Sequence, residues 1–327
     1  MNNFKMLRPE NFKEYSIAQK TIPGSKLPFA GGTDALNLLK ERILQPDYVV
    51  NLKRMADLRG IQQEKNHVRI GATTTIAELA GHPVIREKFP GLQQAAESIA
   101  TPQIRNMGTV GGNLAQRPRC WYFRGETYHC LKKGGGMCYA YVGLNKYHAI
   151  LGGGPCFIVH PSDLAPILIA LNATVHLLNA EGKRRKLALK DFFQLPAQNL
   201  FSETVLQEGE IITHVDVPMP QTGNKNLYLK FKERETADFA LVSVALSLNM
   251  RGNTIKSGQV VLGGVAPVPW VVKEAESLLN GARLTEALAE KVAHAAVQHA
   301  QPLSQNKYKI LLTQNIIKRA FRLITEA

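Results

Sequence analysis

Four cysteines are the residues of this chain best placed to do chemistry together. Cys120, Cys130, Cys138 and Cys156 are its only cysteines, and all fall between positions 120 and 156 of 327. Their spacing, C-x9-C-x7-C-x17-C, lacks the paired C-x2-4-C knuckles of zinc fingers and ribbons. Thiolates on a glycine-rich loop can hold an iron–sulfur cubane, which needs no single fixed spacing. From the residues alone, an iron–sulfur site, a zinc site and free or disulfide thiols all remain open.

Two glycine pairs are a second feature with a chemical use. One lies in Ala30-Gly31-Gly32-Thr33-Asp34 and the other in Thr109-Val110-Gly111-Gly112-Asn113. Glycines let the backbone approach a ligand closely, and successive N–H groups can surround phosphate oxygens. Neither segment is a Walker loop or a G-x-G-x-x-G motif, and a tight turn explains either one alone. Two such loops beside helix or strand ends favour a single dinucleotide held between them.

Two other polar motifs have simpler explanations. His160-Pro161-Ser162-Asp163 reads as a helix cap with a structural histidine. Strand alternation places Tyr228, Lys230 and Lys232 on one face, which the residues alone predict to be a solvated charged face.

The elements that position these motifs fall into three units. In the first, a strand at 28–30 runs into the first glycine pair and a helix at 35–42 follows it. In the second, Thr75 and Glu78 have capping-box spacing in a helix over 73–80. Further helices are predicted over 91–100, ended by Pro102, and over 163–171. The third unit is predicted to be a sheet followed by helices, with strands at 227–231, 240–250 and 257–263 and helices at 273–279, 285–300 and 310–324.

Composition limits the class of protein. Apolar residues make up 45% and charged residues 20%, a globular balance that excludes a mainly disordered chain. The longest nearly apolar stretch, Phe239 to Leu248, is far shorter than the ~20 residues of a membrane-spanning helix. Together with the four cysteines, the net charge of +14 leaves a zinc-stabilised nucleic-acid-binding protein as an alternative.

The order of the motifs resembles one family. AGGTD at 30–34, IRNMGTVGGNLAQ at 104–116, HPSDLAP at 160–166, GEIITHVDVP at 209–218 and YLKFKER at 228–234 are similar to the FAD-binding medium subunit of molybdenum hydroxylases, the xanthine dehydrogenase and carbon monoxide dehydrogenase family. The resemblance implies an α+β fold. A two-subdomain, vanillyl-alcohol-oxidase-like (PCMH-type) FAD-binding domain precedes a C-terminal α+β domain like that of the CO dehydrogenase flavoprotein. The two FAD-binding subdomains are expected at 1–55 and 56–222, and the C-terminal domain at 223–327.

The resemblance also implies which residues contact FAD. The pyrophosphate would be held by the first loop, the second loop would form the opposite wall, and three further residues would lie near the cofactor. The residues carried over are Phe29, Ala30, Gly31, Gly32, Thr33, Asp34, Ala35, Leu36, Thr109, Val110, Gly111, Gly112, Asn113, Asp163, Ile212 and Lys230.

Residues 117–156 depart from the family pattern, because most members run directly from the GGN loop to the SDL segment. The extra residues contain every cysteine. A subset of the family, which includes the flavin subunits of periplasmic aldehyde oxidoreductases and the β-subunits of 4-hydroxybenzoyl-CoA reductases, has such an insert with a [4Fe-4S] cluster. The cysteine spacing, RCWYF and PCFIVHPSD are more similar to the aldehyde oxidoreductase type. The resemblance therefore implies Cys120, Cys130, Cys138 and Cys156 as cluster ligands.

The implied function is electron transfer without a general acid or base. A large molybdenum-cofactor subunit would oxidise the substrate, and a small [2Fe-2S] subunit would pass electrons to FAD on this chain and on to an external acceptor. A 4-hydroxybenzoyl-CoA reductase β-subunit, with inward electron flow, is the alternative. We expect no nucleic-acid partner and no membrane span. The polar N-terminus predicts a cytoplasmic chain, or a periplasmic one if a signal-bearing partner exports it.

Overall fold

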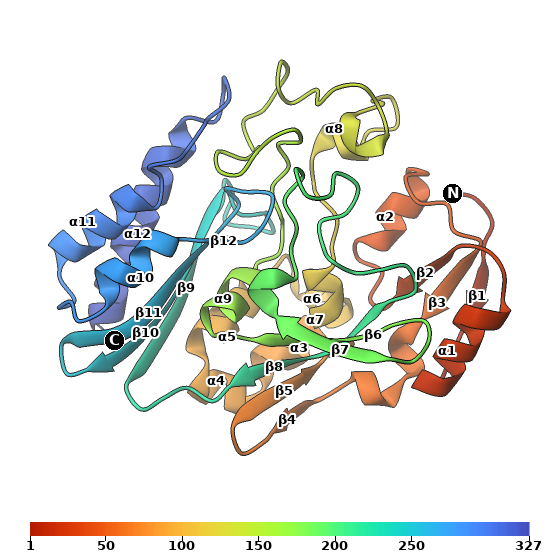
Figure 1. The fold of residues 1–327 in the computed structure, drawn as a ribbon, viewed down its shortest axis with the longest axis horizontal. Coiled ribbons are helices and arrows are strands. Elements are labelled where there is room, and N and C mark those ends of the chain that lie inside the picture. Colours follow the sequence, from red (N-terminus) through yellow and green to blue (C-terminus); the bar gives the residue numbers. More distant parts are fainter. Residues whose placement is uncertain (327) are drawn as a thin grey trace.

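The computed structural model describes residues 1–326, which form three sheets with their helices (Figure 1). The first unit is a parallel three-stranded sheet of order β1-β3-β2. Its strands are β1 (Lys5–Leu7), β2 (Lys26–Phe29) and β3 (Tyr48–Asn51), and its helices are α1 (Phe12–Thr21) and α2 (Ala35–Lys40). The first glycine pair lies between β2 and α2, as predicted.

The second unit contains an antiparallel sheet of order β4-β5-β8-β6-β7. Its strands are β4 (Ile61–Gln63), β5 (His67–Gly71), β6 (Thr174–Leu178), β7 (Arg184–Ala188) and β8 (Ile211–Pro218). Alternate apolar residues of β5, β6 and β8 are buried in a core shared with the helices, and the intervening polar residues occupy the other face. The helices are α3 (Ile76–Gly81), α4 (Pro83–Lys88), α5 (Pro90–Glu97), α6 (Pro102–Met107), α7 (Val110–Leu114), α8 (Trp121–Arg124) and α9 (Leu164–Ala170).

The third unit is an antiparallel sheet of order β12-β11-β10-β9 followed by helices. Its strands are β9 (Asn224–Phe231), β10 (Val242–Arg251), β11 (Thr254–Gly263) and β12 (Trp270–Val271), and its helices are α10 (Lys273–Leu279), α11 (Glu286–Ala295) and α12 (Tyr308–Glu326). Helices α5 and α9 of the second unit also contact this sheet. All seven residues of α9 are buried, as expected of a helix that is apolar on every side.

Several predicted boundaries were wrong for identifiable reasons. Helix α2 ends at Lys40, short of the predicted residue 42, and Arg42 itself has a left-handed φ of +55°. Pro102 begins helix α6 rather than only ending α5, since proline suits the first helical position. Helix α11 ends at Ala295, short of the predicted residue 300. The capping box of Thr75 and Glu78 on α3 is confirmed.

Each sheet lies within one of the segments 1–55, 56–222 and 223–327, and those boundaries stay predictions. Residues 117–156 form the loop-rich region at the top of Figure 1, with the single α-helical turn α8. Within residues 1–326, no helix is long and apolar enough to span a membrane.

Candidate functional site

The first glycine loop owes its shape to close packing. Gly32 has a φ of +72°, a conformation that glycine adopts without strain. A Cβ on Gly31 would overlap the carbonyl oxygen of Met107, and a Cβ on Gly108 would lie 3.5 Å from Oγ1 of Thr33. The two glycine segments therefore meet in space, as the sequence predicted, although more than seventy residues separate them.

The second glycine segment is a short helix rather than the predicted turn. Thr109 caps α7, and its Oγ1 accepts a hydrogen bond from the Gly112 N–H at 3.2 Å. A Cβ on Gly111 would lie 2.9 Å from that of Ala72, so this segment also packs against β5's end. The Asn113 side chain accepts a hydrogen bond from the Ser162 hydroxyl at 2.6 Å. This contact joins the second glycine segment to the start of α9.

The two glycine segments border a cavity of about 330 Å³. Seven of the predicted cofactor residues line it: Thr33, Asp34, Thr109, Gly112, Asn113, Asp163 and Lys230. The other nine do not line it: Phe29, Ala30, Gly31, Gly32, Ala35, Leu36, Val110, Gly111 and Ile212. Ile212 belongs to the hydrophobic core of the second unit, 5% exposed, and so lies apart from this cavity. Leu36 is exposed to solvent.

Asp163 and Lys230 form a buried ion pair in the cavity wall. Their Oδ2 and Nζ atoms are 2.8 Å apart, and both side chains are at most 6% exposed. Lys230 also donates to the carbonyl of Ser98, and the Tyr228 hydroxyl donates to Oδ1 of Asp163 at 2.7 Å. Burial, and secondarily the Asp163 charge, raises the pKa of Tyr228 well above its ordinary value. The solvated face predicted from the residues alone is therefore wrong: these side chains of β9 turn inward.

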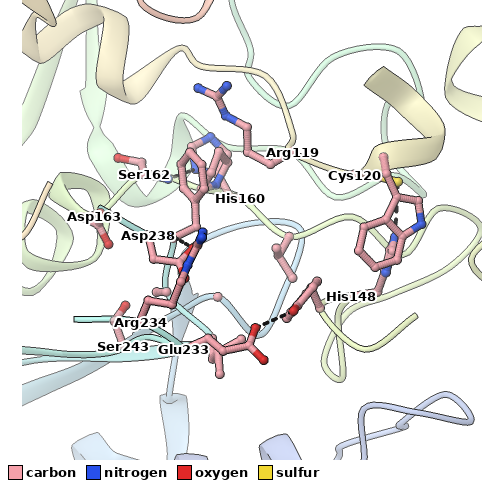
Figure 2. Close-up of a pocket in the computed structure, with 18 residues that line it drawn as sticks. Arg119, Cys120, His148, His160, Ser162, Asp163, Glu233, Arg234, Asp238 and Ser243 are labelled. Atoms are coloured by element: carbon pink, nitrogen blue, oxygen red, sulfur yellow. Dashed lines mark hydrogen bonds and ion pairs between the residues drawn. The ribbon is translucent and has the colours of Figure 1, made fainter. Parts of the chain in front are cut away.

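A second cavity, of about 520 Å³, adjoins the first (Figure 2). The two share the lining residues Arg119, Pro161, Asp163, Arg234, Asp238 and Phe239, which makes them one extended cleft. The Arg119 guanidinium lies over the Phe239 ring, 4.9 Å from its centroid. Of the six, the sequence pointed only to Asp163 as a cofactor contact. The segment from 234 to 239 carried no signal beyond its charges, because the fold alone turns it into the cleft.

His160 is a buried neutral histidine in the wall of the second cavity. Burial lowers its pKa to about 3, and its Nδ1 accepts a hydrogen bond from the Ser162 N–H. Ser162 in turn caps α9, because its Oγ accepts from the Ala165 N–H at 3.0 Å. The structural role predicted for His160 is therefore consistent with its contacts.

The four cysteines gather at the far end of the cleft. The sulfur of Cys138 is hydrogen-bonded to Cys156, and the Cys120 thiol lies close enough to Cys138 and Cys130 to feel their charge. No disulfide forms among residues 1–326. The hydrogen bond with Cys156 lowers the pKa of Cys138 to about 6, whereas burial raises that of Cys120 to about 11. Cys120 also lines the second cavity, so the cysteine group borders the cleft (Figure 2).

Aromatic side chains surround Cys120. The His148 Nε2 lies 3.2 Å from the Cys120 sulfur, and burial lowers the His148 pKa to about 4. Trp121 makes edge contacts with Tyr122, Tyr147 and His148 at centroid distances of 5.9, 5.6 and 5.4 Å. Trp121, Tyr147 and His148 thus form an aromatic wall beside Cys120, and nothing in the sequence indicated the part played by His148.

Two carboxylates hold the cysteine-bearing segment in place. Oδ2 of Asp34 accepts from the Arg117 N–H, and Oδ1 accepts from Arg124 at 2.7 Å and pairs with Arg119 at 3.0 Å. Glu203 is 3% exposed and pairs with Lys132 and Arg117. Asp34 therefore joins the first glycine loop to residues 117–124, a role that the sequence did not indicate.

Comparison with known proteins places this geometry in a family. Residues 2–220 match the family described as FAD binding domain in molybdopterin dehydrogenase, and residues 227–324 match the CO dehydrogenase flavoprotein C-terminal domain. The chain belongs to the FAD-binding medium subunits of the molybdenum hydroxylases. It is thus an oxidoreductase flavoprotein subunit, and the predicted α+β architecture is confirmed.

Relatives of known name match along almost the whole chain. The aldehyde oxidoreductase FAD-binding subunit PaoB of Escherichia coli (strain K12) is 34% identical and covers 97% of this chain and 96% of its own. The glyceraldehyde dehydrogenase medium chain of Sulfolobus acidocaldarius is 29% identical, with 96% and 94% covered. Among solved structures, a chain of the carbon monoxide dehydrogenase from Hydrogenophaga pseudoflava matches with a TM-score of 0.79 and 25% identity, over 99% and 98% of the two chains.

The residues of this medium subunit fit FAD. Gly108 and Gly112 line the first cavity, and glycines let a ligand approach the backbone closely. Arg119 and Arg234 lie where the two cavities meet, and they pair there with Asp34 and Asp238 respectively. The extended, partly apolar cleft suits a dinucleotide whose one end is flat and aromatic.

Proposed function

We propose that this chain is the FAD- and [4Fe-4S]-containing electron-transfer subunit of a molybdenum hydroxylase complex that oxidises aldehydes. One observation carries the proposal: the cleft bordered by the glycine segments continues to Cys120 of the cysteine group. A site for a dinucleotide and a site for a cluster thus share one wall. FAD bound there would supply the redox chemistry, and the protein's own task is to bind and orient it and to exclude water.

The chain's residues divide that task by position. Thr33, Thr109, Gly112 and Asn113 border the cavity where the glycine segments meet, which suits the diphosphate. The ion pair of Asp163 and Lys230 forms the wall between that cavity and the interior. The second cavity, lined by Trp121, Tyr147, Phe239 and Leu241, suits the flat ring system. This assignment extends the residue set expected from the sequence.

The number of cysteines and their grouping support a cluster. Four thiolates are the usual ligand set of a [4Fe-4S] cluster, and they need no single fixed spacing along the chain. The aromatic side chains around Cys120 would limit water access, which tunes a cluster's potential.

Similarity to the E. coli aldehyde oxidoreductase subunit and to the glyceraldehyde dehydrogenase medium chain supports aldehydes as the substrate class. Oxidation would take place on a large molybdenum-cofactor subunit, with a small [2Fe-2S] subunit passing electrons to this chain. An external acceptor would then be reduced at the flavin. The compartment would follow from the signal on a partner subunit.

Purification of the native complex tests the proposal. We expect three kinds of subunit, one FAD per copy of this chain, and about four iron and four sulfide per chain in addition to those of the small subunit. Aldehydes should reduce the enzyme and bleach the flavin absorbance, whereas a hydroxylated aromatic CoA thioester, the electron acceptor of the alternative reductase, should not reoxidise the reduced flavin. A chain that takes up no FAD, or that contains one zinc and no sulfide, would contradict the respective half of the proposal.

A further inference from the structure

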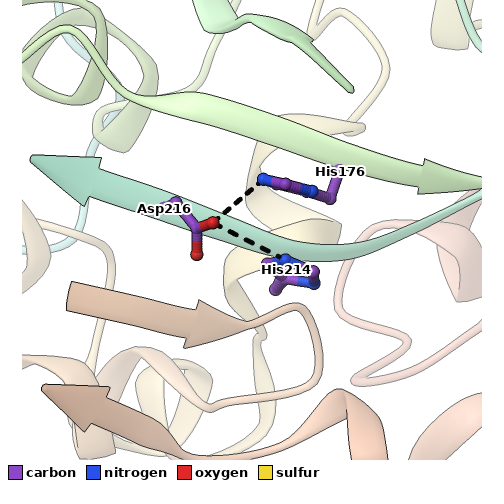
Figure 3. Close-up of side chains that lie close together, drawn as sticks. All are labelled: His176, His214 and Asp216. Atoms are coloured by element: carbon purple, nitrogen blue, oxygen red, sulfur yellow. Dashed lines mark ion pairs between the residues drawn. The ribbon is translucent and has the colours of Figure 1, made fainter. Parts of the chain in front are cut away.

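The outer face of the five-stranded sheet holds a group of side chains that the flavin site does not use. His176 on β6 and His214 and Asp216 on β8 place their ligand atoms within 4.8 Å of one another (Figure 3). The two imidazole rings stack at a centroid distance of 4.1 Å. His176 Nε2 lies 3.0 Å and His214 Nε2 lies 3.8 Å from the same oxygen, Oδ2 of Asp216.

The hydrogen bonds of His214 determine which of its nitrogens carries the proton. The Thr213 hydroxyl donates to the carbonyl of His176 at 3.1 Å and lies 3.0 Å from Nδ1 of His214. These two contacts fit the tautomer in which the hydroxyl gives its one proton to the carbonyl and Nδ1 of His214 donates to the hydroxyl oxygen. Nε2 of His214 therefore bears a lone pair, and this buried atom has no hydrogen-bond partner.

The lone pair on Nε2 of His214 faces Oδ2 of Asp216. Both atoms carry negative charge density, so a cation between them would stabilise the arrangement. His67 on β5 completes the surroundings: its Nε2 lies 3.5 Å from Oδ1 of Asp216 and is likewise buried without a hydrogen-bond partner.

We propose that His176, His214 and Asp216 bind a divalent transition-metal ion of the Zn²⁺ class, with His67 as the nearest further ligand. Two imidazoles and one carboxylate are a donor set that zinc, cobalt, nickel and copper accept. The hydrogen bond that Nδ1 of His214 donates to the Thr213 hydroxyl orients one ligand, as outer partners of metal-bound histidines do. Binding moves the proton of His176 from Nε2 to Nδ1, so the Nε2 lone pair becomes available.

Nearby cations make the site selective. Arg69 holds Asp216 through two hydrogen bonds of 3.0 and 3.2 Å, and Lys186 stands opposite His176 in the strand register. Each carboxylate oxygen accepts more than one hydrogen bond, so Oδ2 keeps capacity for a metal ion. With one carboxylate and two positive neighbours, the site disfavours Mg²⁺ and Ca²⁺, which require several oxygen ligands. A bound ion would link β6 to β8 on the outer face of the sheet.

Cobalt titration of the chelator-treated full-length protein, with its cofactors in place, tests this site. We expect one Co²⁺ per chain with visible bands of nitrogen and oxygen coordination and without intense thiolate charge transfer. Zn²⁺ should displace it and raise Tm, whereas Mg²⁺ and Ca²⁺ should do neither. The substitutions His176→Gln and His214→Gln should each weaken Zn²⁺ binding on the order of tenfold or more. His299→Gln, which removes an exposed imidazole elsewhere, should leave it unchanged.

Thr213→Val is the second variant, because it keeps every ligand and removes only the hydroxyl that orients His214. Weaker Zn²⁺ binding, measured at a temperature at which the metal-free variant is fully folded, supports the site, and unchanged Zn²⁺ binding contradicts the role given to Thr213. The proposal is overturned if Zn²⁺ binding is absent in the unmodified protein, survives both histidine substitutions, or shows only the thiolate spectrum of the cysteines. These outcomes do not depend on FAD or on the identity of the oxidised substrate.

Discussion

At the scale of single residues, the cleft depends as much on glycines, which have no side chain, as on charged side chains. Gly31 and Gly111 allow two chain segments to approach closer than any Cβ would permit. The carboxylate of Asp163 lies at the start of α9, where it pairs with Lys230 and Tyr228 on a different unit. These few residues set both the shape and the charge of the first cavity.

Gly31→Ala should separate the glycine segments. Its Cβ would overlap the backbone of Met107, which cannot move aside as a side chain can. We expect an FAD content well below that of the unmodified protein, and a lower Tm by differential scanning fluorimetry. Gly81→Ala is the matched control, since a Cβ there meets nothing within 4 Å. An equal flavin loss in both variants would contradict this explanation.

Lys230→Met should destabilise the protein and weaken FAD binding together. It leaves the buried carboxylate of Asp163 without its cation, which costs about 3–5 kcal/mol for a buried pair. Urea unfolding measures the loss, and the flavin-to-protein absorbance ratio measures cofactor retention. Lys232→Met is the control, because Lys232 sits two residues along the same strand end and bonds only to the backbone of 235 and 236. Unchanged unfolding midpoints would show that the pair contributes little.

At the scale of elements, the cysteine-bearing segment has little regular structure and is instead fastened by ion pairs. Asp34 binds its first residues, and Glu203 binds Arg117 and Lys132. Both carboxylates come from segments distant in sequence. The segment is therefore ordered by long-range contacts, and each fastening can be removed separately.

Glu203→Gln should loosen the cysteine-bearing segment. The Lys132 ammonium, 2% exposed, would lose its only charged partner in the described chain and retain the Leu200 carbonyl. We expect faster proteolysis between residues 117 and 156 and faster iron loss to a chelator. Glu208→Gln is the control, because Glu208 lies in the same loop before β8 and makes no ion pair among residues 1–326. It should leave both rates unchanged. If iron loss is as slow as in the unmodified protein, Glu203 does not hold the segment.

The connection before β8 should weaken in acid. Burial alone would raise the pKa of Glu210, but its hydrogen bonds with Arg185 and the Gln207 N–H hold that pKa below its ordinary 4.5. Because the pKa is depressed in the folded state, this stabilisation is present above pH 4.5 and is lost as the pH falls through the lower value. The urea concentration at half-unfolding, measured from pH 7 down to pH 3, should fall more steeply with falling pH for the unmodified protein than for Arg185→Gln. Parallel profiles would contradict this.

At the scale of the whole molecule, the cleft is built from all three units. Thr33 comes from the first, Thr109 and Asp163 from the second, and Lys230 and Phe239 from the third. Helices α5 and α9 of the second unit pack against strands of the third sheet and so connect the two units (Figure 1). A cofactor held there would contact every unit at once.

Removal of FAD should therefore lower the stability of the whole chain. Saturation at a hundredfold excess over Kd stabilises a folded protein by about 2.7 kcal/mol. We expect a lower Tm for the flavin-free protein, restored by FAD and only partly by AMP or riboflavin, each of which fills one part of the cleft. Equal restoration by AMP alone would show that the second cavity does not hold the ring system.

The sequence by itself determined the family, the two glycine segments, the helix caps and the clustering of the cysteines. Those are local patterns, since spacing and residue type are already present in the unfolded chain. Only the tertiary structure decided that Lys230 pairs with the buried Asp163, that Ile212 packs in the core, and that Arg234 and residues 237–239 line the cleft. It alone brought Asp34 to Arg124, Glu203 to Lys132, and His176 to His214 and Asp216. Such pairs depend on strand register and on which faces pack together, and contacts between distant segments leave no periodic signal in a single sequence.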